Sequence, residues 1–396
     1  MLRCVVNHKL PVKGRLSAWL RVALLVGLLP VFSACAKFSE DVELDTVGSG
    51  GGGGSGGSGS AGCAQFCDDY GSQYEVGTPS TRSATPSKLF LGDKRTLAYS
   101  TYPSLMDAHN ALNTGDEPIA SIDTGATAQW DEGWTGKGVK VAVLDQFDWD
   151  DGTIDDHGEQ VSLVVNSVAP EATLNMRNST LYTDDINAAW VAFNDDEYHI
   201  INNSFGRARF NHNTGVENTN FDAEVTNAVS INYEITGSAT YDEDILFIFA
   251  AGNSGNYCPD KRIHECTFGA AVLHQQRANG KEDKDAVMWV GSLTDDGTAL
   301  AGYSHSAGEM ANDFMVAHDD VLTKGDLAGT SFAAPRVTGA AALVRQKFPL
   351  LDGQELKSLL LNTATDMGAA GPDPIFGMGK LDLNNALSPQ GIFTAQ

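Results

Sequence analysis

Residues 329–344 of the 396-residue chain read GTSFAAPRVTGAAALV. A polar turn that begins with glycine leads directly into small and apolar residues at helical spacing, so we expect a helix to begin there. Ser331 would then lie beside unpaired backbone N–H groups and the positive end of the helix dipole. A serine in this position is either a nucleophile next to an oxyanion site or simply the N-cap of the helix.

Short apolar runs precede this stretch and alternate with segments of helical pattern. The runs span residues 139–144, 172–176, 199–203, 245–251 and 287–293. We expect helices at 159–168, 183–193, 221–233, 337–347 and 355–363. Such alternation predicts an α/β fold: a three-layer sandwich with a mostly parallel central sheet and helices on both faces. In such sheets the functional residues gather at the C-terminal ends of the strands.

The charge balance excludes one class of partner. The chain has 51 Asp and Glu against 26 Lys and Arg, for a formal net charge of −25. Nucleic-acid binding requires a basic surface, so we expect no nucleic-acid partner. The acidity is typical of a strongly solvated surface.

The N-terminus has the pattern of an export signal over residues 1–34. Basic residues are followed by an apolar run, 22–32, that is too short to span a membrane and contains Gly27 and Pro30. Residues 33–36 read SACA and resemble the bacterial lipobox, which predicts lipidation of Cys35; ordinary cleavage at small residues is the alternative. We therefore expect an exported bacterial protein, either a lipoprotein of the outer membrane or cell surface, or a periplasmic or secreted protein.

The remaining chain divides into three parts by composition. Residues 35–62 hold the anchor site and an almost pure Gly and Ser linker, a flexible tether. Residues 63–118 show no sustained period and are either an N-terminal arm or a short pro-segment. Residues 119–396 contain the predicted sheet and its helices.

Export implies an oxidising compartment, which favours disulfides. The four candidates are Cys63, Cys67, Cys258 and Cys266, and they allow three connectivities, of which two local bridges are the simplest. A metal site is less favoured, because the second pair lies in a loop and the neighbouring His264 lacks regular ligand spacing.

Four polar residues stand where the predicted strands end or helices begin. Asp145 ends the first strand, His157 opens the next helix, Asn253 ends a later strand and Ser331 opens the last long helix. The order Asp, His, Ser is one of the known arrangements of the acyl-transfer triad. His199 and His212 are alternative bases, but neither precedes a predicted helix.

Several stretches resemble those of the subtilisin-like serine peptidases, in the order of that family. Residues 329–335 resemble the nucleophile signature, 136–145 (GKGVKVAVLD) the strand with the Asp, and His157-Gly158 the start of the His helix. Further similar stretches are VAPEA at 168–172, NNSFG at 202–206 and AAGNSG at 250–255. The resemblance covers roughly residues 119–388.

The ending GMGKLDL at 377–383, with PRVTG at 335–339, is most similar to the peptidase passenger domains of bacterial autotransporters. The sequence ends at Gln396, so we expect the membrane barrel of autotransporters to be absent. A lipid anchor would then be the only association with a membrane.

The resemblance implies roles for named residues. Ser331 would be the nucleophile, His157 the general base and Asp145 the group that orients it, while Asn253 would donate to the oxyanion. Substrate would bind along Ser204, Phe205, Gly206, Ala251 and Gly252. The resemblance thus implies an endopeptidase acting on proteins or peptides through an acyl-enzyme; the oligomeric state is not predicted.

Two differences from the family favour an alternative, a catalytically impaired binding or adhesion module with the same fold. Gln146 and Phe147 follow Asp145 where the family commonly has a small residue and Gly, and the gap to His157 is short. No cofactor or catalytic metal is expected. The family often binds structural calcium, and the acidic loop 148–156 offers oxygen ligands, but without recognisable spacing we expect a solvated loop there.

Overall fold

The computed structural model describes residues 76–80, 90–91, 124–147, 157–178, 198–231, 245–281, 286–319 and 328–389. All of them belong to one compact unit that spans residues 60–396. The signal segment, Cys35, the Gly/Ser linker, Cys63, Cys67, the acidic loop 148–156 and the helix expected at 183–193 lie outside the described residues.

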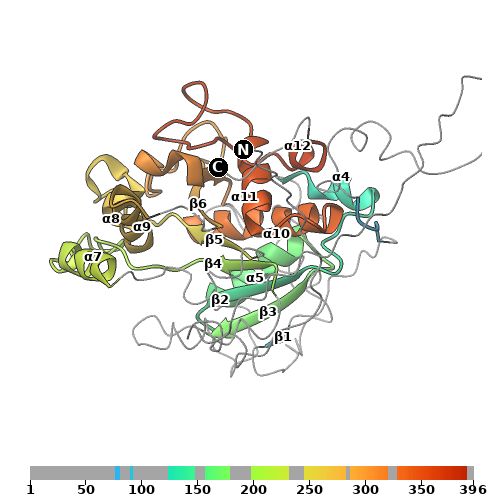
Figure 1. Cartoon of the computed structure of the whole chain (residues 1–396), viewed down its shortest axis with the longest axis horizontal. Coiled ribbons are helices and arrows are strands. Elements are labelled where there is room, and N and C mark those ends of the chain that lie inside the picture. The colour runs from blue at the N-terminus through green and yellow to red at the C-terminus, as the bar shows by residue number, and fades with distance from the viewer. Residues whose placement is uncertain are drawn as a thin grey trace, which may run out of the picture. The chain divides into compact units, whose positions relative to one another are not determined.

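The centre of the unit is a parallel sheet, which confirms the predicted fold class (Figure 1). Its seven strands have the order β1-β3-β2-β4-β5-β6-β7, and all neighbouring pairs are parallel. They are β1 (Phe90–Leu91), β2 (Lys140–Asp145), β3 (Thr173–Asn178), β4 (Ile200–Asn203), β5 (Leu246–Ala250), β6 (Val287–Ser292) and β7 (Phe314–Ala317). The five expected strands are present, and β1 and β7 extend the sheet at its two edges.

The helices of the described residues include four of the five that the sequence predicts. They are α4 (Ala126–Asp131), α5 (His157–Val168), α7 (Phe221–Ser230), α8 (Ile263–Cys266), α9 (Phe268–Ala278), α10 (Thr330–Lys347), α11 (Gly353–Asn362) and α12 (Leu383–Leu387). Two 3₁₀ turns, η3 (Pro259–Lys261) and η4 (Gly308–Asp313), complete them. None of the described helices is both long and apolar enough to span a bilayer.

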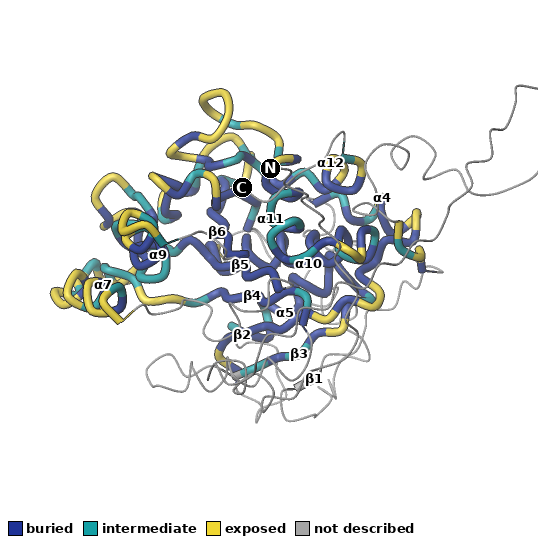
Figure 2. Tube along the Cα trace, viewed as in Figure 1, coloured by how far each residue is buried: buried dark blue, intermediate teal, exposed yellow. Residues whose placement is uncertain are grey.

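Two apolar cores lie on opposite faces of the sheet, because successive side chains of a strand point to opposite sides. In β2, Val141 and Val143 pack into the core shared with α5, α10, α11 and α12. Ala142 and Leu144 pack into the core shared with α8, α9 and η4. The central strands and α10 are therefore buried, whereas α7, which packs on α9, is largely exposed (Figure 2).

Helix α10 packs against α5 and the sheet through small residues. A Cβ atom at Gly339 would lie 2.5 Å from Cβ of Val168 on α5, so a larger side chain would push the two helices apart. All of α10 except Arg345 and Lys347, near its C-terminal end, is buried. The run of Ala and Gly in the sequence is thus the surface that lets α10 lie deep in the fold.

Part of the segment 63–118 packs on the main unit. Gly77 N–H donates to the carbonyl of Lys347 at 2.7 Å, and Ser80 N–H donates to that of Gly133 at 2.9 Å. Nearby, Oε1 of Gln346 accepts from the N–H groups of Thr135 and Gly136, both at 2.8 Å. Residues 76–80 therefore lie against the C-terminal end of α10, and β1 adds a strand to the sheet.

Candidate active site

Asp145 and His157 form a direct pair at the C-terminal edge of the sheet. Asp145 is the last residue of β2 and is 1% exposed, while His157 is the first residue of α5 and is partly buried. Nδ1 of His157 lies 2.7 Å from Oδ1 of Asp145. Because a carboxylate only accepts, Nδ1 carries the proton, and Nε2 is the nitrogen left to act as a base.

The residues that depart from the family pattern hold this pair in place. Gln146 N–H donates to Oδ1 of Asp145 at 2.7 Å, and the carbonyl of Gln146 accepts from Gly158 N–H at 3.0 Å. The ring of Phe147 is so close that a Cβ atom at Gly158 would lie 2.6 Å from it. Gln146, Phe147 and Gly158, the immediate neighbours of Asp145 and His157, therefore hold these two residues together.

Burial and the carboxylate act in opposite directions on His157. Burial lowers its pKa, but the hydrogen bond that His157 donates to Asp145 and the charge of that carboxylate raise it, and the net pKa lies above the ordinary value of 6.5. The imidazolium form is therefore stabilised, as a base that must hold a proton during a reaction requires.

Ser331 is the second residue of α10, and its side chain makes a contact outside the helix. The N-cap is Gly329, so the N-cap alternative for Ser331 is wrong. Oγ of Ser331 donates to the carbonyl of Ser204 at 3.0 Å, just beyond the end of β4. Among the described residues no hydrogen bond joins Ser331 Oγ to His157, although the ring of Phe332 lies 5.6 Å from that of His157. Hydrogen bonds of this kind often form only with substrate bound.

Pro335 explains a second link between β4 and α10. Proline has no N–H, so the carbonyl of Ser331, four residues earlier, receives no hydrogen bond from within the helix. Oγ of Ser204 donates to that carbonyl instead, at 2.9 Å. Asn202 Nδ2 in turn donates to Ser204 Oγ at 3.0 Å. The hydroxyl and the carbonyl of Ser204 thus both bind Ser331, the candidate nucleophile, and fix its position.

Asn253 is oriented by the residue that precedes Ser331. Its Oδ1 accepts from the backbone N–H of Thr330 at 2.9 Å and from Oγ1 of Thr330 at 2.8 Å. Thr330 Oγ1 also accepts from Gly252 N–H at 3.0 Å. With Oδ1 engaged, the amide presents Nδ2 as a donor beside the turn at Gly329. Thr330 was not singled out from the sequence, although its position next to Ser331 could have suggested it.

His305 lies against the loop that carries Asn253 and forms hydrogen bonds with residues on both sides of Asn253. Nδ1 lies 2.9 Å from the carbonyl of Ala251 and 2.8 Å from Oγ1 of Thr267, and Nε2 lies 2.9 Å from Oγ of Ser254. A carbonyl only accepts, so Nδ1 carries the proton and Nε2 accepts from Ser254. The ring is fully buried, and burial lowers its pKa to about 4, which keeps it neutral near pH 7.

Gly252 is required by this arrangement. Its φ is +109°, and a Cβ atom there would lie 2.9 Å from the ring of His305. No periodic pattern or motif in the sequence marks His305, which follows β6 in a segment of small residues. Its role depends on contacts with residues about 50 positions away, which only the tertiary structure brings together.

The other predicted residues occupy distinct places. Phe205 is half-buried and Gly206 exposed just beyond β4, while the carbonyl of Ala251 is engaged by His305. His199 precedes β4 at the opposite end of the strand, where its Nδ1 accepts from Lys140 N–H at 3.0 Å, and His212 lies exposed in a loop. Among the described histidines, His157 is the one that pairs with Asp145.

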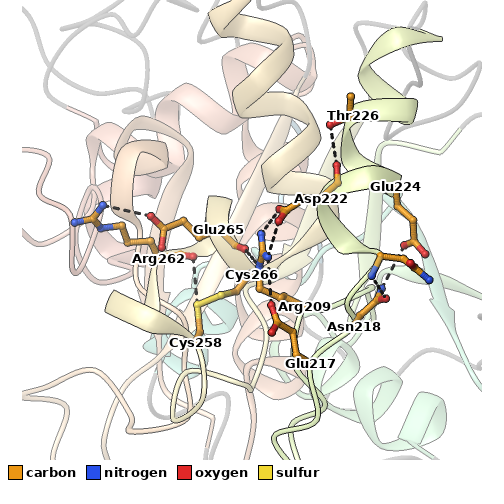
Figure 3. A network of polar contacts seen from close by, with 11 residues as sticks. Arg209, Glu217, Asn218, Asp222, Glu224, Thr226, Cys258, Arg262, Glu265 and Cys266 are labelled. Atoms are coloured by element: carbon orange, nitrogen blue, oxygen red, sulfur yellow. Dashed lines mark hydrogen bonds and ion pairs between the residues drawn. A yellow bond between two sulfur atoms is a disulfide. The ribbon is translucent and has the colours of Figure 1, made fainter.

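A disulfide joins Cys258 to Cys266, one of the two predicted local bridges, near an ionic network (Figure 3). Arg209 links this region to α7: its Nε donates to the carbonyl of Glu265 at 2.8 Å, and its guanidinium pairs with Asp222. The loop beyond Asn253 is therefore fastened both covalently and by charge.

Comparison with known proteins gives a consistent set of relatives. The model of the Subtilase family matches residues 150–379, more than half of the chain. That range contains His157, Asn253 and Ser331 and begins five residues after Asp145.

Among the relatives, the neisserial autotransporter lipoprotein NalP of Neisseria meningitidis serogroup B is 28% identical over 271 residues, 58% of this chain and 24% of NalP. An extracellular serine protease of Serratia marcescens is 42% identical over 69 residues, 17% of this chain and 7% of that protein. The chain thus spans a quarter or less of the length of these relatives. The solved structure of the prenylagaramide maturation protease PagA is 23% identical and has a TM-score of 0.45, covering 67% of this chain and 97% of PagA.

The contacts of His157 predict how it titrates. In Asp145→Asn the charge and the carboxylate hydrogen bond are lost while burial remains, so the pKa of His157 falls below that of the wild type. Imidazole resonances followed by NMR against pH measure this change. Buried His305, whose contacts do not include Asp145, is the internal control. An unchanged pKa of His157 would contradict the pairing.

The burial of His305 predicts an acid-dependent loss of stability. Between pH 6.5 and about 4 the unfolded chain binds a proton at His305 and the folded chain does not, so stability falls as the pH is lowered through this window. The loss at this site is roughly 3 kcal/mol. Urea unfolding at several pH values should show His305→Asn, which cannot titrate, losing less stability than the wild type. His212→Asn is the matched control, and parallel curves for wild type and His305→Asn would refute the assignment.

Proposed function

Because the chain belongs to the subtilase family, we propose that it is a serine endopeptidase that hydrolyses peptide bonds through an acyl-enzyme. The observation that carries the proposal is the 2.7 Å pair of Asp145 and His157 at the sheet edge where α10 begins with Ser331. The proposal is supported by the chemistry of these three groups, which are of the types that an acyl-transfer triad requires and come from separate elements.

In the proposed acylation step, Oγ of Ser331 attacks the carbonyl carbon of the substrate peptide. Nε2 of His157 takes the hydroxyl proton and then gives it to the leaving amine, so that the C–N bond breaks and an ester forms on Ser331. A water molecule then attacks this ester with the same assistance from His157. The acid part of the substrate is released and the hydroxyl of Ser331 is restored. Asp145 holds the Nδ1–H tautomer throughout and stabilises the imidazolium.

The oxyanion formed in this step needs donors placed in advance. We assign this role to Nδ2 of Asn253 and the backbone N–H of Ser331. The assignment is supported by the engagement of Asn253 Oδ1 with Thr330, which fixes which end of the amide is the donor. His305 and Thr330 act as positioning residues for this loop, since neither would touch the substrate.

Protein or peptide substrates follow from the family. We propose that an extended substrate lies along residues 204–206 and 251–252, beyond the ends of β4 and β5, and pairs with the main chain around Ser204 and Gly206. Support for this placement comes from Gly206, which is exposed at the end of β4. The two segments flank the proposed position of the scissile carbonyl.

We further propose that the protein is exported and anchored through Cys35. The support is the export signal and lipobox-like residues of the N-terminus, together with the similarity to NalP, which is named an autotransporter lipoprotein. The Gly/Ser linker would then separate the peptidase from a membrane surface.

The proposed nucleophile is tested with a fluorophosphonate probe. The wild-type protein is expected to be labelled and Ser331→Ala to be unlabelled, since the probe reacts with an activated serine hydroxyl. Ser230→Ala, at the exposed end of α7, is the matched control and keeps full labelling. An unlabelled wild type under conditions that label a control subtilisin would favour the non-catalytic binding module instead.

The proposed role of Asn253 at the oxyanion can be tested by measuring kcat and KM. Asn253→Ala is expected to lower kcat by about 100- to 1,000-fold with little change in KM, since the donor acts mainly in the transition state. A change confined to KM would place Asn253 in substrate binding instead.

The anchor is tested by mass spectrometry of the mature protein from the bacterial host. An N-terminal Cys35 carrying acyl chains is expected for the wild type, and Cys35→Ser should lack them. Recovery of an unmodified N-terminus from the wild type would support ordinary signal cleavage.

A further inference from the structure

Two histidines and a glutamate from three separate elements lie close together in the region that follows the Asn253 loop in the sequence. They are His264 on α8, His274 on α9 and Glu309 on η4. One potential ligand atom from each lies within 4.8 Å of the others. Figure 1 shows α8 and α9 beside each other at one end of the sheet. None of these residues has a role in the proposed reaction.

The backbone at Gly308 packs closely against this cluster. Gly308, with φ +56°, packs so closely on His264 that a Cβ atom would lie 2.7 Å from Cε1 of the ring. The two imidazole rings lie 4.5 Å apart between centroids. Nε2 of His274 lies 2.8 Å from Oε2 of Glu309, and the N–H of Glu309 donates to Nδ1 of His264 at a longer 3.3 Å.

The charges around the cluster favour a cation. The nearby guanidinium of Arg262 is already engaged by Asp260 at 3.5 Å and by Glu265 at 3.4 Å. Asp260 and Glu265 thus offset the charge of Arg262, and a third carboxylate, that of Glu309, lies against His274. A divalent ion would face a net negative environment.

We propose that His264, His274 and Glu309 form a binding site for a divalent transition-metal ion, with Zn²⁺ as the best match. Two imidazole nitrogens and a carboxylate are a common ligand set for Zn²⁺, and water can fill the fourth tetrahedral position. Ligand atoms around Zn²⁺ lie roughly 3.3 Å apart, whereas those of the cluster lie within 4.8 Å of one another, so small side-chain movements would suffice to bind an ion. Calcium fits poorly, because it prefers six to eight oxygen ligands.

The position of the site gives it a structural consequence. Thr267 connects α8 to α9 and His305 lies shortly before η4, and these two residues contact each other and the carbonyl of Ala251. An ion bound to α8, α9 and η4 would fasten the same three segments together from outside. The site acts as a cross-link beside the Cys258–Cys266 disulfide, and its existence does not depend on the proposed peptidase activity.

The test is thermal unfolding of the full chain with and without Zn²⁺. For the wild type, Zn²⁺ at about 100 times its Kd should raise the melting temperature by roughly 5 °C. His274→Ala and Glu309→Gln, which preserve the core because Glu309 is exposed and His274 is partly exposed, should each show a much smaller rise. His212→Ala removes an exposed imidazole elsewhere and is expected to respond as the wild type does.

A second measurement identifies the ligands. Co²⁺ added to the wild type should give the visible absorption of a four-coordinate site, and His264→Ala should weaken it at least tenfold. The proposal is overturned if the wild type shows no shift with Zn²⁺. It is equally overturned if the shift persists in His274→Ala and Glu309→Gln, which would assign binding to other groups such as Cys63 and Cys67.

Discussion

The burial of α10 is the constraint on which the rest of the structure depends. A helix buried along nearly all its length can lie against both α5 and the sheet only if its contact surface is built from small residues, and Gly339 touches Val168 with no room for a Cβ atom. This close contact sets where α10 begins, and therefore where Ser331 lies relative to β4 and α5. Pro335 adds to it, because the carbonyl that it leaves without a helical donor is the one that Ser204 binds. The apolar helix and the polar site are thus consequences of one packing arrangement.

Two sets of neighbours prepare the site before any substrate arrives. Gln146, Phe147 and Gly158 bring Asp145 and His157 together across a short connection, while Thr330 and His305 hold the loop with Asn253 from its two sides. Electrostatic stabilisation works best when donors are fixed in advance, because no reorganisation is then needed during the reaction. The two histidines have opposite environments: a carboxylate stabilises the charged form of His157, and burial keeps His305 neutral.

Several cross-links lie close together in the region next to the Asn253 loop. The disulfide joins Cys258 to Cys266 of α8, Arg209 links Asp222 of α7 to the carbonyl of Glu265 on α8, and His274 of α9 contacts Glu309 of η4. This region covers one face of the sheet with few long apolar helices, so covalent and polar links replace part of the contact area that α10 provides on the other face.

The sequence by itself determined the parallel α/β fold and the family, and it predicted Asp145, His157, Asn253 and Ser331 as site residues, because buried strands, helix starts and a local nucleophile signature are all encoded by neighbours in the chain. Only the tertiary structure decided that Gln146 and Phe147 support the pair of Asp145 and His157, a point on which the sequence favoured the opposite interpretation. It also decided the contacts of His305 and the grouping of His264 with His274 and Glu309, whose partners lie 10 to about 50 residues away. Such contacts leave no periodic signal, since they depend on how separate elements pack and not on the pattern within any one of them.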